Sequence, residues 1–214
     1  MTQHSPHGRL GIILTPILTL LLVVSGCGSR EPFRSDRFYS LAPLPLEAPA
    51  GPAVQATLLV NELSARGFLG GRQIVFRTAE EPLLAQRYQD LLWEEPVPRA
   101  MARALVDAIR AAAAFERVLT PANRARADYL LGGEMERFEH LPTAQPPRVV
   151  GTLNLALLRA ADRRSIWNRQ YSGEVLVEGA TPAAMAEAFN RLAARLAGDV
   201  VRDLRTLRQR PGTL

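Results

Sequence analysis

The chain has 214 residues, with 26 basic and 21 acidic side chains and a formal net charge of +5 at pH 7. This length suits one folded domain of ordinary size, and 47% hydrophobic residues suffice to build a core. The basic side chains are all arginine and form no basic and aromatic stripe on any one element, which argues against nucleic-acid binding. A single cysteine excludes an intramolecular disulfide.

The N-terminus has the layout of an export signal. Residues 10–24 carry no charge, follow Arg9 and end at two small residues and Cys27. This order is typical of a secretory signal, and the run is shorter than the roughly 20 residues of a membrane-spanning helix. Small residues before a thiol that can accept a diacylglyceryl group form a lipobox, so the N-terminus resembles a bacterial lipoprotein precursor. We predict a signal peptide over residues 1–26 and lipidation of Cys27.

The segment 27–54 is rich in proline, glycine, alanine and charged residues and is predicted to be a tether. Within it, Phe38 to Leu41 forms one short predicted strand. Residues 57–60 and 73–78 are rich in β-forming side chains and predict two further strands. The loop between them, residues 66–71, contains glycines that can adopt positive φ.

Next, the prolines Pro96 and Pro98 mark the start of an amphipathic helix that we expect to run to about Ala114. Strands are predicted over residues 115–120 and 128–139. In the second of these, Gly132-Gly133 predicts a bulge or a close approach of another chain segment.

The last third of the chain gives the clearest periodicity. Residues 148–158 alternate apolar and polar side chains, and a turn at residues 162–164 joins them to a second alternating run, which predicts a β-hairpin. Thr181 as N-cap followed by proline begins a helix predicted to extend to Leu207. We assign the folded domain to residues 55–207 and expect residues 208–214 to be a disordered tail.

The chain offers few groups for catalysis. If the signal peptide is removed and Cys27 is acylated, His140 is the one remaining histidine, and its place at a strand end predicts a solvated loop side chain without a catalytic role. Histidines and cysteines do not occur at metal-ligand spacing, and the glycine-rich loop lacks the patterns of nucleotide-binding loops. We therefore expect a protein that is not an enzyme and that needs no metal or cofactor.

Phe68, Leu69 and Trp93 are the candidate partner-docking residues. Each lies near a predicted loop, and aromatic side chains are enriched at the centres of protein interfaces. Packing in the core remains the alternative for all three.

Several motifs, in this order behind the lipobox, resemble the ABC-type transport auxiliary lipoproteins, which include the PqiC-like intermembrane transport lipoproteins. The motifs are Phe38-Tyr39-Ser40-Leu41, Gly67-Phe68-Leu69, Gln73 to Arg77, Tyr88 followed by Trp93-Glu94-Glu95-Pro96, Phe115 to Leu119 and Ala127 to Glu134. The resemblance covers nearly the whole chain after Cys27. It implies an α+β domain in which two amphipathic helices pack on an antiparallel sheet.

The resemblance also implies a role. Such a lipoprotein, carrying two or three acyl chains with palmitate among them, would serve an ABC ATPase, a permease and a periplasmic MCE-domain protein that move phospholipid or other hydrophobic molecules between membranes. A homo-oligomeric ring is one assembly that this role allows. Gly28 and Ser29 follow the cysteine where aspartate would signal inner-membrane retention, which predicts the periplasmic face of the outer membrane. A structural or assembly lipoprotein of another envelope complex remains the alternative.

Overall fold

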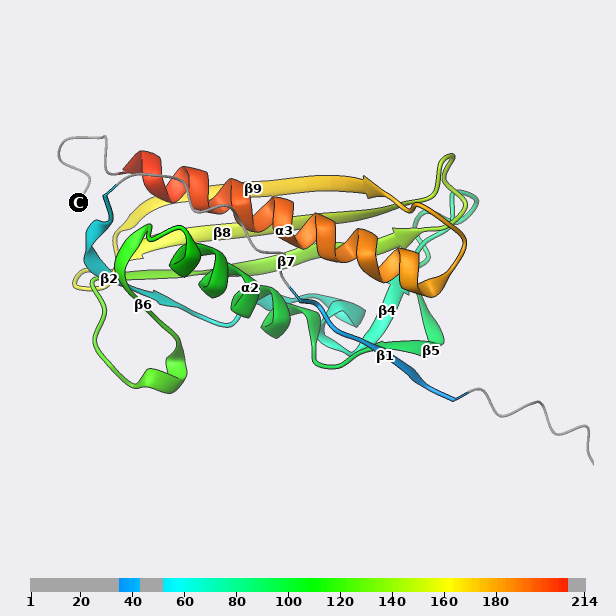
Figure 1. The fold of residues 1–214 in the computed structure, drawn as a ribbon, viewed down its shortest axis with the longest axis horizontal. Helices are drawn as coiled ribbons and strands as arrows, with labels where there is room; N and C mark the ends of the chain where they lie inside the picture. The colour runs from blue at the N-terminus through cyan, green and yellow to red at the C-terminus, as the bar shows by residue number, and fades with distance from the viewer. Residues whose placement is uncertain (1–34, 43–51, 208–214) are drawn as a thin grey trace, which may run out of the picture. The chain divides into compact units, whose positions relative to one another are not determined.

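The computed structural model describes residues 35–42 and 52–207. Within these residues, nine strands form one curled sheet, which is the framework of the fold (Figure 1). The predicted signal peptide, the lipidation site Cys27 and the predicted tail over 208–214 lie outside the described residues. All the strands and helices described below belong to one unit that begins at Asp36.

The long strand β7 (Tyr129–Leu141) is the centre of the sheet. Along one edge it pairs antiparallel with β8 (Arg148–Arg159), which in turn pairs antiparallel with β9 (Ser165–Leu176). The predicted hairpin over the last two strands is confirmed. Its turn places Arg163 at φ 59°, and the Arg164 N–H donates to the Asp162 carboxylate at 3.1 Å.

The other edge of β7 is paired in segments. The strands β2 (Val54–Val60), β3 (Ser64–Ala65) and β4 (Gln73–Phe76) follow one another along it, and each runs parallel to β7. A short 3-10 helix, η1 (Gly67–Gly70), separates β3 from β4. The sheet is therefore mixed, and the prediction of a purely antiparallel sheet is wrong, because alternation in a sequence shows which face is buried but not the direction of the neighbouring strand.

Three further strands complete the sheet. The strand β5 (Gln86–Trp93) turns back antiparallel to β4, and β1 (Arg37–Tyr39) pairs parallel with β5. On the other side, β6 (Phe115–Leu119) pairs parallel with β2 and is followed by the 3-10 helix η2 (Pro121–Asn123). The pattern of β5 begins with five residues that are mostly polar, so the sequence does not predict this strand.

Two helices cover one face of the sheet: α2 (Val97–Ala111) and α3 (Pro182–Leu207) (Figure 1). Both predicted helices are thus confirmed, and the Ala184 N–H donates to Thr181 Oγ1 at 3.1 Å as expected of an N-cap. Beneath α3, Gly151 of β8 pairs with Gly173 of β9. A Cβ at Gly151 would lie 3.1 Å from Leu192, so this glycine pair lets the helix approach the sheet closely.

An aromatic cluster joins α3 to the sheet. The Trp93 ring of β5 meets the Phe189 ring of α3 edge to face with centroids 5.3 Å apart, and Phe138 of β7 lies 4.7 Å from Phe189. All three side chains are buried. Aromatic pairs at such distances contribute about 0.5–1.5 kcal/mol beyond their buried area, so the cluster fastens the C-terminal helix to two strands distant in sequence.

The close approach predicted at Gly132-Gly133 is found at Gly133. Its φ is 156°, and an added Cβ would lie 1.9 Å from the carbonyl oxygen of Asn154 on β8. At Gly132 an added Cβ would have only ordinary contacts, the nearest at 3.6 Å to Asn61.

We expect Gly133→Ala to lower the free energy of unfolding by about 3 kcal/mol, because either β7 or β8 must shift to admit the methyl group. Gly132→Ala is the matched control and should change it by less than about 1 kcal/mol. Urea denaturation followed by circular dichroism measures both values. Equal stability of the two variants would show that the strands can separate there at little cost.

Candidate partner-binding site

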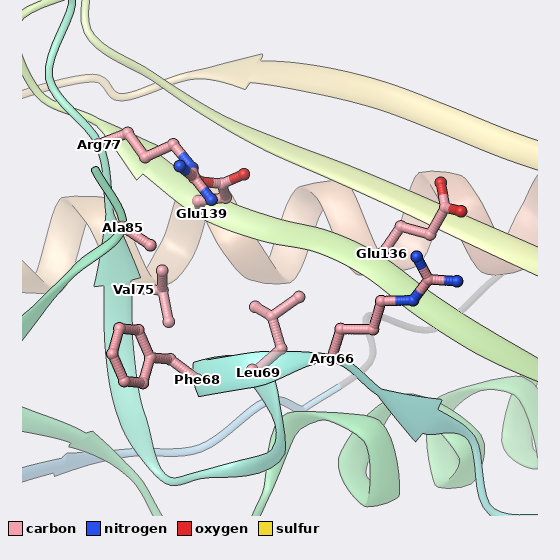
Figure 2. Close-up of a pocket in the computed structure, with 9 residues that line it drawn as sticks. Arg66, Phe68, Leu69, Val75, Arg77, Ala85, Glu136 and Glu139 are labelled. Atoms are coloured by element: carbon pink, nitrogen blue, oxygen red, sulfur yellow. The ribbon is translucent and has the colours of Figure 1, made fainter. Parts of the chain in front are cut away.

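A hollow of about 280 Å³ lies beside η1, on the face of β7 that points away from α3 (Figure 2). Gly67 begins η1 with φ 54°, a left-handed conformation that favours glycine. The turn is closed by a bond of 3.2 Å from the Leu69 N–H to the Arg66 carbonyl and one of 3.1 Å from the Gly71 N–H to the Phe68 carbonyl. The predicted glycine loop is therefore a fixed turn that positions Phe68 and Leu69.

Phe68 and Leu69 point in different directions from this turn. The Phe68 side chain is 44% exposed, and the Arg87 guanidinium carbon lies 4.3 Å from the centroid of its ring. That distance is within the range of a cation–π contact. Leu69 is 8% exposed and lines the hollow together with Val75 (Figure 2). Of this pair, Phe68 is the side chain that a partner can reach.

Trp93 does not belong to this surface. It is 2% exposed, in the aromatic cluster under α3, because the last residues of β5 turn their apolar side chains into the core. A side chain in that position cannot contact a partner, so Trp93 is removed from the candidate docking residues, and its core packing is the better interpretation.

An ionic cluster borders the hollow. The Glu139 carboxylate on β7 is 4% exposed and accepts hydrogen bonds from Arg77 Nε at 2.5 Å and from Arg137 Nε at 2.8 Å. The cluster therefore carries two positive charges for one negative charge. Arg137 and Glu139 are two residues apart in a strand, which places them on the same face, and this spacing is the one sequence signal that could have identified the pair.

A second ion pair lies across the hollow. Arg66 donates to both carboxylate oxygens of Glu134, at 2.6 and 3.1 Å, and the hydrogen bond with Glu134 raises the pKa of Arg66. Glu136 also lines the hollow and accepts a bond of 3.3 Å from Gln170. The hollow thus has an apolar floor and a rim of paired charges, which suits contact with a polar protein surface better than binding of a single ion.

His140 lies inside β7, not in a solvated loop as predicted. Its side chain is buried beside a second cavity of about 380 Å³, and its Nδ1 is 2.8 Å from the Tyr88 hydroxyl. Burial lowers the pKa of His140 to about 4 and raises the pKa of Tyr88 to about 12. Both groups are therefore neutral near pH 7. The strand extends past the predicted end because β4 pairs with its last residues.

Among the described residues, no group of three or more histidine, cysteine, aspartate or glutamate side chains is arranged to hold a metal ion. Within the same part of the chain, neither helix combines the length and the hydrophobicity that crossing a bilayer requires.

Comparison with known proteins identifies the family. The model of the ABC-type transport auxiliary lipoprotein component matches residues 39–201, so the chain belongs to this family of ABC transport auxiliary lipoproteins. The predicted family is thereby confirmed. No curated protein matches the chain by sequence.

Solved structures share the fold. Protein XCC0632 from Xanthomonas campestris, of family DUF330, is 26% identical with a TM-score of 0.73, covering 81% of this chain and 97% of its own. An uncharacterized protein is 15% identical with a TM-score of 0.63, covering 79% of this chain and 99% of its own. The first of these solved proteins belongs to the same family as this chain.

We expect Glu139→Gln to destabilise the protein by about 2 kcal/mol, because two charge-assisted hydrogen bonds to a buried carboxylate would be weakened, although the Arg77 and Arg137 side chains are themselves 29% and 47% exposed. Glu134→Gln, which affects a more exposed ion pair, is the control and should cost at most about 1 kcal/mol. Chemical denaturation at pH 7 compares the two variants. A smaller loss for Glu139→Gln than for Glu134→Gln would contradict a structural role for the cluster.

The buried histidine also predicts a pH dependence. The pKa of His140 is about 4 in the folded protein against an ordinary 6.5, so between these values the unfolded chain binds a proton that the folded chain does not. The stability contributed by neutral His140 is complete above pH 6.5 and is lost as the pH falls toward 4. Thermal melts should show a steeper fall in Tm over this window for the native chain than for His140→Gln. Parallel curves would mean that His140 is hydrated.

Proposed function

We propose that this protein is a lipoprotein anchored to the periplasmic face of the outer membrane, where it is an auxiliary subunit of an ABC transport system with an MCE-domain partner. The system moves phospholipid or other hydrophobic molecules between membranes. The observation that carries the proposal is the family match over residues 39–201 in a chain whose N-terminus has a lipobox at Cys27.

The contents of the domain support a role without catalysis. His140 is the one histidine among the described residues, and its hydrogen-bond partner is the Tyr88 hydroxyl. Burial keeps the imidazole and the hydroxyl neutral near pH 7. Glu139 is occupied by two arginines. The lowered pKa of His140 makes it a weak base near pH 7, and both Glu139 oxygens already accept hydrogen bonds from arginines. We propose that the domain acts by binding.

We assign the partner contact to the hollow beside η1. Phe68 supplies a half-exposed aromatic ring, Arg87 lies over it, and the ionic cluster forms a polar border. Aromatic and arginine side chains surrounded by polar groups are the usual composition of an interface centre and its rim. The hollow therefore has the chemistry needed to dock the periplasmic subunit of the transporter.

Photo-crosslinking in cells tests this assignment. A photoreactive amino acid in place of Phe68 should trap the MCE-domain subunit encoded near the protein's gene, whereas the same probe at the exposed helix residue Glu187 should not. Introducing Cys27→Ala into the Phe68 probe strain should abolish the crosslink and remove the protein from the outer-membrane fraction. Crosslinks to components of another envelope machine would instead favour the structural or assembly role.

A further inference from the structure

The loop between β4 and β5, residues 77–85, presents apolar side chains to solvent. Leu83 is 95% exposed and Leu84 is 48% exposed, although each carries a large apolar side chain. Single exposed leucines are ordinary on protein surfaces, but these two are adjacent in one loop, and Leu83 lies in its turn.

The loop is held in place by its own hydrogen bonds. Arg77 Nη1 donates to the Pro82 carbonyl at 3.2 Å, and the Ala79 N–H donates to Thr143 Oγ1 in the turn after β7 at 2.7 Å. A further bond of 3.0 Å joins the Leu84 N–H to the Glu81 carbonyl. The two leucines are therefore exposed in a loop whose conformation is held by hydrogen bonds to the sheet and within the loop.

The same end of the domain carries more apolar surface. Leu176, at the end of β9, is 48% exposed, and the next residue, Val177, donates from its N–H to the Pro147 carbonyl at 3.0 Å. The β7–β8 turn thus links the β4–β5 loop to the end of β9. In Figure 1 this turn and the β9–α3 connection lie toward the right, while the β8–β9 turn lies at the left.

The described domain begins near the same end. Because β1 runs parallel to β5, with Arg37 opposite Leu91, the first described residues, Ser35 and Asp36, precede Arg37 on the side of the start of β5. Seven residues lie between Cys27 and Ser35, so the two are joined by eight residue-to-residue steps. A chain of that length spans at most about 29 Å, so a lipid on Cys27 would keep this end of the domain near the bilayer.

We propose that Leu83 and Leu84 insert into the surface of the bilayer that holds the acylated Cys27, so that the domain lies on the membrane by its β4–β5 loop. This proposal rests on the lipid anchor of the proposed function. A tip of two leucines suits the headgroup and acyl boundary, whereas centres of protein interfaces are enriched in tryptophan, tyrosine and arginine and poor in leucine. The anchor also raises the local concentration of the loop at the surface, so weak insertion is sufficient.

Depth-dependent quenching tests the proposal on the full-length lipoprotein in vesicles of phosphatidylethanolamine and phosphatidylglycerol. Thioether-linked Cys27 does not react with maleimide, so a cysteine introduced at Glu81 can be labelled alone with an environment-sensitive fluorophore. Its fluorescence should fall at least twofold when a tenth of the lipid carries a nitroxide at acyl carbon 5. The same label at Ala161, in the exposed β8–β9 turn, should not respond.

Adding Leu83→Ser and Leu84→Ser to the Glu81 probe should reduce quenching to the level at Ala161, with an unchanged circular dichroism spectrum. If the protein floats with the vesicles but the two sites are quenched equally, insertion is wrong and the anchor stands. If Cys27 reacts with maleimide, the anchor is absent and both proposals fail. Protection of the Glu81 label in native membranes but not in protein-free vesicles would assign the loop to a protein partner and overturn membrane insertion.

Discussion

The two edges of β7 impose the main constraint on this fold. Buried backbone N–H and C=O groups must be paired. Because β7 is 13 residues long, its second edge has more backbone groups to pair than any one short strand can supply. The strands β2, β3 and β4 meet this need in succession. Because η1 interrupts the path between β3 and β4, its position over the sheet is fixed by strand pairing on both sides. The location of Phe68 is therefore a consequence of backbone hydrogen bonding.

The two faces of β7 carry different kinds of side chain. Phe138 and His140 point to the helix-covered side, where Phe138 packs on Phe189 and His140 meets Tyr88. Between them, Glu139 points to the opposite side and binds two arginines. Alternation with period two thus supplies the core and the ionic cluster from neighbouring residues. A register slip of one residue would bury Glu139 without its arginines, which makes the cluster a strong determinant of register.

Local signals in the sequence predicted much of the fold. Helix entry at Thr181, the alternating runs of the last hairpin and the glycines at 67 and 133 each act through their own backbone preferences, and each is found where expected. Long-range features were not predictable in this way. Strand direction depends on the path of the chain between strands, and the burial of Trp93 depends on Phe189, which lies almost 100 residues later. Likewise, no local pattern reveals that β4 extends the pairing of β7 past His140.

Arg77 joins the ionic cluster to the β4–β5 loop, whose last residue, Ala85, also lines the hollow. Its Nε binds Glu139 beside the hollow on the sheet, and its Nη1 binds the Pro82 carbonyl next to the exposed leucines. An arginine can hold both positions because its guanidinium group presents several donors in a rigid plane, which lysine lacks. These two bonds fix the orientation of the β4–β5 loop relative to β7, the most extensively paired strand. For a protein proposed to bind a transporter on one surface and a bilayer on another, this link fixes the angle between the two surfaces without requiring either to be large.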